Sequence, residues 1–166
     1  LFQKGALYDY MTVEENILFP LTMFTDQENE EKIERVNECL KRVNLTNSNK
    51  LLPSELSGGM TKRVSIARAI VMNPKYLLCD EPNSGLDPKT AIIIDNLIQE
   101  ITIENNITTI VNTHDMNSVM EIGERIAYLY KGKLSWQGTK EELINTKNKE
   151  LNDFVFASKL FKRLKK

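Results

Sequence analysis

The spacing of apolar residues predicts that helices and strands alternate along this chain. In the first half, apolar residues recur every three or four positions, which is the period of an amphipathic helix. Residues 32–43 carry the clearest stripe of this kind, which consists of Ile33, Val36, Leu40 and Val43. Further helices are predicted over residues 13–19, 89–103, 117–122, 140–144 and 151–164, and in the run between Ser57 and Ile70.

Shorter apolar runs predict strands between these helices. Residues 76–79 are four consecutive apolar residues, a pattern typical of a strand that is buried on both faces of a parallel sheet. Residues 107–112 predict a second strand, and the start of the chain has the character of the end of another. Residues 125–130 and 134–137 flank the turn at Gly132 and predict a hairpin. We therefore expect an α/β protein with a mostly parallel sheet.

Two helix starts have the spacing of a capping box, in which two side chains each bond the other residue's backbone N–H. Thr12 is followed three residues later by Glu15, and Thr139 is followed in the same way by Glu142. We expect Pro20 to interrupt or kink the first helix, because proline has no N–H to donate.

Ser57, Gly58 and Gly59 stand immediately before a predicted helix. Ser57 can cap that helix, and two residues without Cβ let another molecule's phosphate approach the backbone closely. The N-terminus of a helix adds unpaired N–H groups and partial positive charge, so it can bind an anion. Taken alone, the three residues fit an ordinary helix cap equally well.

Asp80 and Glu81 follow the first predicted strand, and ligands of parallel sheets collect at the carboxyl ends of strands. Neighbouring strand residues point to opposite sides, so the two carboxylates should have different roles. One can hold Mg²⁺, and the other can orient or deprotonate a water molecule. His114, the only histidine, follows the second strand. An acidic helix entry and a core histidine are the alternatives for these residues taken alone.

Composition narrows the choice of protein class. The chain has 166 residues, which suggests about one domain, and 41% of them are hydrophobic, enough to build a core. The net charge of −1 shows no basic bias, so no nucleic-acid partner is expected. No apolar run reaches the length of a membrane-spanning helix, and we expect no signal peptide. Cys39 and Cys79 fit unpaired thiols in a reducing compartment.

Four segments, in their order and spacing, resemble the motifs of an ABC-type ATPase domain. These are LSGGM (56–60) as the signature, YLLCDEP (76–82) as Walker B with its catalytic glutamate, SGLDP (84–88) as the D-loop and NTHD (112–115) as the H-loop. The likeness covers residues 1–138. It implies a partial P-loop NTPase fold, with a helical subdomain beside the mostly parallel sheet.

The resemblance also implies roles for individual residues. Glu81 would be the catalytic residue that polarises the attacking water, and His114 would contact the γ-phosphate. The residues expected to bind ATP and Mg²⁺ are Gln3, Ser57, Gly58, Gly59, Asp80 and Asp87. Among these, Asp80 and Gln3 would hold the metal. Asp87 would link the two sites of a dimer, in which each signature faces the partner's ATP.

The resemblance divides the chain into four parts. Residues 1–7 would hold the end of a strand and the glutamine loop, and residues 8–73 the helical subdomain with the signature. Residues 74–138 would form the core with Walker B, D-loop and H-loop, and residues 139–166 the C-terminal helices. The phosphate loop G-x-x-x-x-G-K-[ST] does not occur in the sequence. We therefore expect a fragment of a longer ATPase, unable to bind or hydrolyse ATP well alone.

A finer likeness concerns residues 2–9, 12–16, 19–21 and 52–55, and the methionine that ends LSGGM. In these positions the chain is similar to the Mla-type ATPases of bacterial phospholipid trafficking. That subgroup implies a homodimer of ATPase domains with transmembrane permease subunits, a periplasmic MCE-domain protein and lipid as cargo. It also implies a cytoplasmic location, peripheral on the inner membrane.

Three alternatives remain open at this point. An importer ATPase for amino acids or organic solutes would keep the chemistry and change only the cargo. A non-transport ABC protein would be of the chromosome-maintenance or translation-factor kind. The former has a very long coiled coil before its signature, whereas only a short stretch separates Gln3 from Leu56 here. A regulatory subunit with an inactive site is the third alternative, against which Glu81 and His114 argue.

Overall fold

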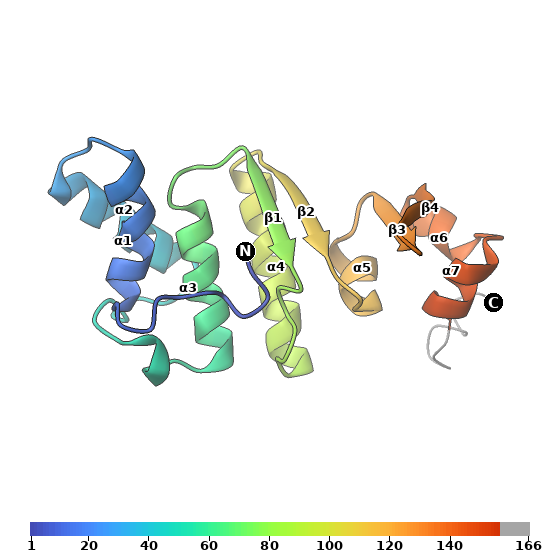
Figure 1. The fold of residues 1–166 in the computed structure, drawn as a ribbon, viewed down its shortest axis with the longest axis horizontal. Coiled ribbons are helices and arrows are strands. Elements are labelled where there is room, and N and C mark those ends of the chain that lie inside the picture. Colours follow the sequence, from blue (N-terminus) through green and yellow to red (C-terminus); the bar gives the residue numbers. More distant parts are fainter. Residues whose placement is uncertain (157–166) are drawn as a thin grey trace. The chain divides into compact units, whose positions relative to one another are not determined.

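The computed structural model describes residues 1–156 and divides the chain into two compact units (Figure 1). The first unit is Leu1–Thr113, and the second begins at His114. Of the helix expected over residues 151–164, only the first part lies in the described range. The basic residues at its end, which are Lys159, Lys162, Arg163, Lys165 and Lys166, lie outside it.

Helices dominate the first unit. The helices are α1 (Val13–Phe24), α2 (Asn29–Arg42), the 3-10 turn η1 (Pro53–Glu55), α3 (Gly58–Ile70) and α4 (Pro88–Glu104). The strands are β1 (Tyr76–Asp80) and β2 (Thr108–Asn112). The four α-helices and both strands lie where the sequence predicts them, with ends that differ by a few residues, whereas η1 was not predicted.

Helix α1 begins with the predicted capping box. Glu15 N donates to Thr12 Oγ1 at 3.2 Å, and Thr12 N donates to Glu15 Oε2 at 2.7 Å. Pro20 was expected to interrupt or kink this helix, and it does not interrupt it, because the helix continues through Pro20 to Phe24. Burial of three side chains on one face, those of Val13, Ile17 and Leu21, offsets the backbone hydrogen bond that proline cannot make.

Strands β1 and β2 are parallel, as predicted, with Tyr76 opposite Thr108 and Asp80 opposite Asn112. Leu1 adds a backbone contact at the other edge of β1. Its amino group donates to Leu78 O at 2.6 Å, and Asp80 N donates to Leu1 O at 2.9 Å. This alternation is the pattern of a parallel neighbour and fits the expectation that the chain starts at the end of a strand.

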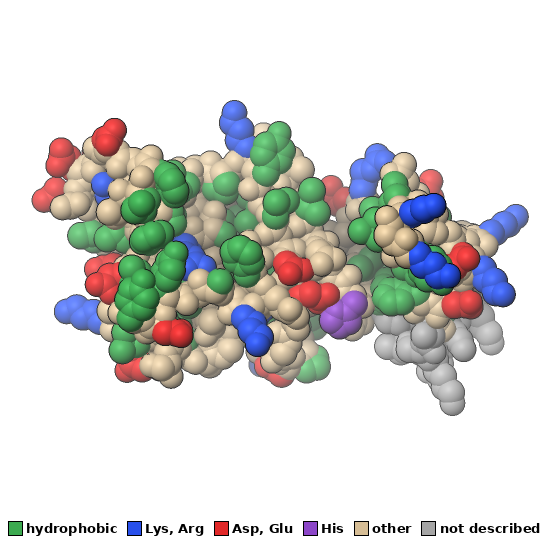
Figure 2. Space-filling model, in the orientation of Figure 1, with side chains coloured by type: hydrophobic (Ala, Val, Ile, Leu, Met, Phe, Trp, Pro, Cys, Tyr) green, Lys and Arg blue, Asp and Glu red, His purple; other side chains and the backbone are tan. Residues whose placement is uncertain are grey.

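The sheet is buried on one face only, which contradicts the expectation of two buried faces. Leu77 and Cys79 are each 3% exposed, whereas Tyr76, Leu78 and Ile110 are 71, 62 and 61% exposed. Figure 1 shows α4 behind the two strands, and Figure 2 shows apolar side chains over their open face. The apolar residues of β1 are typical of a strand covered on both faces, but in this chain helices cover only one face of the sheet.

The core of the first unit joins α1 to α4 with β1. Its largest fully buried side chains are Ile17, Leu40, Ile66, Ile94, Ile98 and Ile101. Helix α2 turns a slightly different face inward than its apolar stripe predicts. Ile33 is 41% exposed, while Cys39 is buried beside Val36 and Leu40 as a free thiol.

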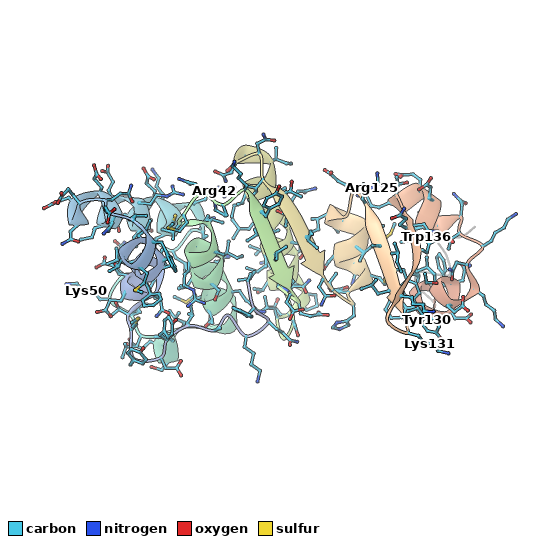
Figure 3. All side chains as sticks on the ribbon, turned by 45° about the horizontal axis from the view of Figure 1, so that its top comes forward. Arg42, Lys50, Arg125, Tyr130, Lys131 and Trp136 are labelled. Carbon is cyan, nitrogen blue, oxygen red and sulfur yellow. The ribbon has the colours of Figure 1, made fainter. Side chains whose placement is uncertain are left out.

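The second unit is smaller and contains an antiparallel hairpin. Its elements are α5 (Met116–Ile122), β3 (Ile126–Tyr130), β4 (Lys133–Gly138), α6 (Lys140–Ile144) and α7 (Lys149–Val155). Lys131 and Gly132 have φ of 50° and 72°, as the primed two-residue hairpin turns require. Figure 3 shows Tyr130 and Lys131 at this hairpin tip. Among residues 1–156, no helix has both the length and the apolar character needed to span a membrane.

Candidate functional site

The carboxyl ends of β1 and β2 hold a polar pair. Asp80 is the last residue of β1 and Asn112 the last of β2, and the parallel register places them opposite each other. Asn112 Nδ2 donates to Asp80 Oδ1 at 2.7 Å. Asp80 is exposed, and Asn112 binds only its Oδ1, so the carboxylate can still bind a ligand. The predicted Mg²⁺ ligand thus lies at the strand ends, held by an asparagine that the motif analysis left without a role.

The backbone of Glu81 leaves the strand in a strained conformation. Its φ of 46° lies in the left-handed region, which costs a residue with a side chain on the order of 1 kcal/mol or more. Hydrogen bonds hold it on both sides. Glu81 N donates to Asn112 O at 2.8 Å, and Ser84 N donates to Glu81 O at 3.2 Å. The catalytic candidate therefore stands on a turn whose backbone is fixed by its neighbours.

Gln3 meets this turn from a distant part of the sequence. Gln3 Nε2 donates to Ser84 Oγ at 3.4 Å, while the side chain as a whole is exposed. The structure therefore brings the Gln3 side chain to the turn that follows Asp80 and Glu81. Asn112 and Ser84 complete the group.

Lys62 is a buried cation beneath the same group, and the sequence analysis did not identify it. It is 5% exposed, and its Nζ donates to Gln3 O and, at 3.2 Å, to Glu81 O. Burial lowers the pKa of Lys62, and the nearby carboxylates of Glu81 and Asp80 oppose that shift. A signal was present: Lys62 lies four residues before Ile66, on the buried stripe of α3, where a lysine is unusual.

The segment after Gln3 lies along the same helix. Gly5 has a φ of 81°, and a Cβ at this position would collide with Ser65 Oγ, so only glycine fits. Arg68 Nη2 donates to Gly5 O at 2.7 Å. Asn16, fully buried, receives a hydrogen bond from Tyr8 N at 2.8 Å and donates to three backbone carbonyls. The glutamine loop is therefore a fixed segment supported by α3 and α1.

The signature residues form the start of α3, as predicted. Ser57 is the N-cap and accepts from Met60 N at 3.3 Å, so its hydroxyl proton can still be donated to a ligand. Ser57 and Gly58 are exposed, and Gly59 is half-buried. A Cβ on Gly59 would come within 2.9 Å of Thr90 Cγ2. The signature therefore packs against the first turn of α4.

Asp87 caps α4 with its side chain. Its Oδ1 accepts from Lys89 N at 3.1 Å and from Thr90 N at 3.0 Å, and its Oδ2 accepts from the Thr90 hydroxyl. The side-chain hydrogen bond from Thr90, together with the backbone ones, lowers the pKa of Asp87. Signature and D-loop candidates thus lie on neighbouring helix starts, with Asp87 exposed and ionised at neutral pH.

His114 is exposed and is the first residue of the second unit. It follows Asn112 by two residues, so the chain leads directly from the strand-end pair to the imidazole. The structure gives no position for it relative to Asp80 or Glu81. Its assignment therefore continues to depend on the motif alone.

The residues present fit the chemistry of Mg²⁺ with a bound nucleotide. Mg²⁺ usually takes one or two protein oxygens and fills its remaining positions with phosphate and water. Asp80 offers an exposed carboxylate with one oxygen not bound by Asn112, and Gln3 offers an amide at the neighbouring turn. In residues 1–156, no set of three or more His, Cys, Asp or Glu residues could form a metal cage of their own. A site completed by substrate phosphates is the arrangement that fits.

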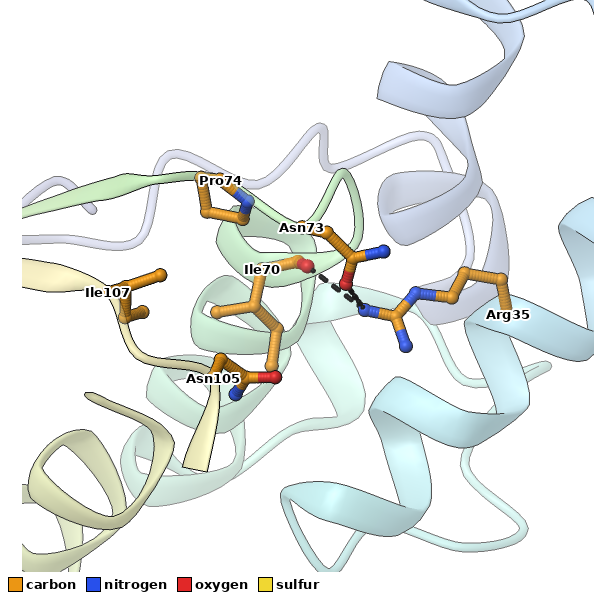
Figure 4. Close-up of a pocket in the computed structure, with 6 residues that line it drawn as sticks. All are labelled: Arg35, Ile70, Asn73, Pro74, Asn105 and Ile107. Carbon is orange, nitrogen blue, oxygen red and sulfur yellow. Dashed lines mark hydrogen bonds between the residues drawn. The ribbon is translucent and has the colours of Figure 1, made fainter. Parts of the chain in front are cut away.

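A pocket of about 270 Å³ lies at the N-terminal ends of β1 and β2, opposite the ends that carry Asp80 and Asn112 (Figure 4). It is lined by Arg35, Ile70, Asn73, Pro74, Asn105 and Ile107. Arg35 donates to Val71 O, Ile70 O and Asn73 Oδ1 at 3.1, 3.2 and 2.5 Å. The donors of Arg35 are used to cap the backbone carbonyls at the C-terminus of α3. The pocket is separate from the site at Asp80 and Glu81.

Comparison with known proteins gives consistent matches. A model of the ABC transporter family matches residues 1–84. The methionine import ATP-binding protein MetN 2 of Bacillus cereus is 41% identical over 156 residues, which cover 93% of this chain and 46% of that protein. The probable ribonucleotide transport ATP-binding protein mkl of Mycobacterium leprae is 36% identical over 155 residues, or 93% and 45% of the two chains.

Solved structures agree with the sequence matches. The dimeric structure of an ATP-binding cassette in a post-hydrolysis state, bound to ADP and Pi, matches with a TM-score of 0.74 and 37% identity. The match covers 83% of this chain and 60% of that one. The chain spans less than half the length of the two curated relatives. The family model alone covers half of the residues, including the signature and both Walker B carboxylates, and this chain belongs to the ABC transporter family.

Proposed function

We propose that this chain is part of an ATP-hydrolysing subunit that powers an ABC transporter. The observation that carries the proposal is the convergence of Gln3, Asp80 and Glu81 at the end of β1. The hydrogen bond from Gln3 to Ser84 joins segments 81 residues apart. Phosphoryl transfer depends on positioning and charge neutralisation, and this group offers metal ligands and a carboxylate on a rigid turn.

In the proposed site, each residue has a distinct task. Asp80 would hold Mg²⁺ with the oxygen that Asn112 leaves open, and Gln3 would complete the shell of metal and water. Mg²⁺, when bound, neutralises charge on the phosphates. Glu81 would accept a hydrogen bond from the attacking water and orient it toward the γ-phosphate. His114 would donate to that phosphate.

A second set of residues would act on the ATP of a partner subunit. Ser57 can donate its hydroxyl, and Gly58 and Gly59 can present backbone N–H groups at the N-terminus of a 13-residue helix. Asp87, on the neighbouring helix start, would face the partner at the dimer interface. The dimeric structure of the matching ATP-binding cassette supports this arrangement.

We propose that a phosphate loop is contributed by part of the whole protein that lies outside this chain. The relatives are about twice as long as the matched segment. The open face of the sheet supports the proposal, because parallel sheets are normally covered on both faces. Tyr76, Leu78 and Ile110 would then be covered, and the 166-residue chain alone would bind ATP weakly.

For cargo and partners, two candidates follow from different observations. The likeness to Mla-type ATPases favours phospholipid, with transmembrane permease subunits and a periplasmic MCE-domain protein, at the cytoplasmic face of the inner membrane. The relatives named for methionine and ribonucleotide transport make a small organic solute the second candidate. We propose phospholipid as the cargo, on the strength of the segments before and within the signature.

Steady-state ATP hydrolysis by the full-length protein tests the ATPase function. Glu81→Gln should keep MgATP binding and lower turnover about 10²- to 10⁴-fold. The 166-residue chain, titrated with MgATP by calorimetry, should show little binding. Unchanged turnover in Glu81→Gln would exclude the role of Glu81, and tight binding by the short chain would require a phosphate site within it.

Affinity purification of the full-length protein from its membranes tests the cargo. Co-purification of a permease with an MCE-domain protein, and of phospholipid with the complex, is the expected result. Co-purification of a permease with a solute-binding protein instead would favour a small organic solute. Loss of methionine uptake in a deletion strain would exclude lipid as the sole cargo.

A further inference from the structure

Lys62 lies on the signature helix and holds two backbone segments of the subunit's own site. Its Nζ donates to Gln3 O, in the glutamine loop, and to Glu81 O, in the turn after β1. Helix α3 thus carries the proposed ligand for the partner's ATP at its first residues and, one turn later, the cation that ties together the two segments. Lys62 is only 5% exposed, so it is not an ordinary surface lysine whose ammonium group is hydrated by solvent.

The contact to Glu81 matters because of the backbone strain there. Glu81 has a left-handed φ of 46°, and its carbonyl accepts from Lys62 Nζ on α3 and from Ser84 N within the same turn. A residue with a side chain keeps such a conformation only where its surroundings over-determine it. Lys62 supplies a charged donor to this turn, and charge-assisted hydrogen bonds are stronger than those between neutral groups.

The contact to Gln3 fixes the second segment. Gly5 and Arg68 hold the far side of the glutamine loop against α3, and Lys62 holds its near side. The side chain of Gln3 then reaches Ser84 Oγ at 3.4 Å. A displacement of Lys62 would therefore move both the glutamine loop and the Glu81 turn.

We propose that Lys62 is a positioning residue, which uses one ammonium group to keep Gln3 and Glu81 in register with each other and with the signature helix. The inference rests on the proposed ATPase function of the same site. Lys62 does not touch substrate in this scheme. Its effect on catalysis passes through the backbone of Glu81 and Gln3, and any movement of α3 at the dimer interface is transmitted to both.

The test compares variants of the full-length protein. Lys62→Met keeps the length of the side chain and removes every donor. Lys62→Gln keeps an amide donor that is too short to reach both carbonyls. Lys41→Met, at an exposed position on α2, is the matched control for loss of one lysine charge. Two measurements are made on each variant: turnover with KM for MgATP, and hydrogen–deuterium exchange without nucleotide.

Lys62→Met should lower kcat about 10- to 100-fold and change KM by about threefold or less, since small misplacements of catalytic groups mainly slow the reaction. Exchange should accelerate in residues 2–8 and 81–86 and stay unchanged in the rest of α3. Lys62→Gln should show the same pattern to a smaller extent. If Lys62→Met fails to fold, the pattern in Lys62→Gln decides.

Two results would overturn the inference. One is a kcat for both variants within about twofold of the parent, a change too small for lost positioning. The other is accelerated exchange throughout α3, which would show a purely structural role. If the parent itself does not hydrolyse ATP, the proposed function fails, and the exchange data still decide whether Lys62 holds the two segments.

Discussion

Asn112 donates a hydrogen bond of 2.7 Å to one carboxylate oxygen of Asp80, so the end of β2 orients the side chain at the end of β1. The backbone carbonyl of the same asparagine accepts from Glu81 N at 2.8 Å. Asn112 thus holds the carboxylate of Asp80 with its side chain and the backbone of Glu81 with its own backbone carbonyl. Substitution of the side chain should affect only the first of these.

Asn112→Ala should raise the Mg²⁺ concentration needed for half-maximal ATP hydrolysis by the full-length protein. A residue that orients a metal ligand typically changes metal affinity about 10- to 100-fold. Titration of Mg²⁺ at saturating ATP measures the effect. Thr108→Ala, at the other end of the same face of β2, is the control and should behave as the parent. Equal Mg²⁺ dependence in the two variants would show that Asn112 does not orient Asp80 as a metal ligand.

Arg35 and Arg42, both on α2, should differ sharply in their contribution to stability. Arg35 binds backbone carbonyls at the end of α3 in addition to its ion pair with Glu38, whereas Arg42 (labelled in Figure 3) pairs with the exposed carboxylates of Glu104 and Glu100, at 2.7 and 3.3 Å. Arg35→Met should cost about 1–3 kcal/mol, because polar acceptors lose their partner. Arg42→Met should cost about 0–1 kcal/mol, because exposed ion pairs contribute little.

Denaturation in urea measures both free energies of unfolding. A raised salt concentration should reduce the small effect of Arg42→Met further, since salt screens surface ion pairs. Equal losses in the two variants would mean that Arg35 does not serve as the C-terminal cap of α3.

Gly58→Ala and Gly59→Ala should separate folding from function in the signature. Neither glycine has a positive φ, and a Cβ on Gly58 would meet Leu86 Cδ2 at an ordinary 3.4 Å. Gly58→Ala should therefore be neutral or stabilise by up to about 1 kcal/mol. Gly59→Ala should destabilise by about 1–3 kcal/mol, because its Cβ would press on Thr90. Rotation of Thr90 away would break its hydrogen bond to Asp87.

The stability difference is measured by thermal or urea unfolding, and hydrolysis by the full-length protein is measured in parallel. Gly58→Ala should lower hydrolysis about tenfold or more, since an added Cβ obstructs the approach of a phosphate to the backbone. Full activity in a stable Gly58→Ala variant would argue against phosphate binding at this helix start.

Both cysteines should be unreactive in the folded protein. Burial raises the pKa of Cys79 to about 11 from the ordinary 9.0, and burial also raises that of Cys39. At pH 8, about one Cys79 thiol in a thousand would then be ionised, and the thiolate is the reactive form. A thiol reagent should modify the protein only as fast as it unfolds, and both thiols at once in denaturant.

The raised thiol pKa also predicts a pH dependence of stability. The Cys79 thiol holds its proton more tightly in the folded state than in the unfolded state. Its contribution to the free energy of unfolding is therefore complete below pH 9 and is lost as the pH rises toward 11. Cys79→Ala should reduce this alkaline loss in urea unfolding measured at pH 8 and pH 10. An identical alkaline loss in parent and variant would assign it to other groups.

Much of the local structure follows from the sequence because its causes are local. The Thr12–Glu15 and Thr139–Glu142 capping boxes join residues three apart, and the Ser57 cap forms in the same way. The motif residues Gln3, Asp80 and Glu81 could also be named in advance. Their chemistry depends on residue type and on position at a strand end, both of which the sequence displays.

Contacts between distant segments could not be predicted in this way. Lys62 reads as one more polar residue of a helix until Gln3 and Glu81 are placed beside it, 59 and 19 residues away. Asn112 gains its role only when the register of β1 and β2 sets it opposite Asp80. These partners become neighbours only when the whole unit packs, and a pattern within a short segment does not reveal them.

By itself, the sequence determined which segments form the α-helices and strands, where the helices capped by Thr12, Ser57 and Thr139 begin, and which residues carry the motifs of an ABC ATPase. Hydrogen bonds over three or four residues and the periodicity of apolar side chains are enough for that. The tertiary structure alone decided that the β1–β2 sheet has one open face, that Glu81 takes a left-handed backbone, and that a buried ammonium group holds it there. These features arise because desolvation and long-range hydrogen bonding depend on what surrounds a residue in space.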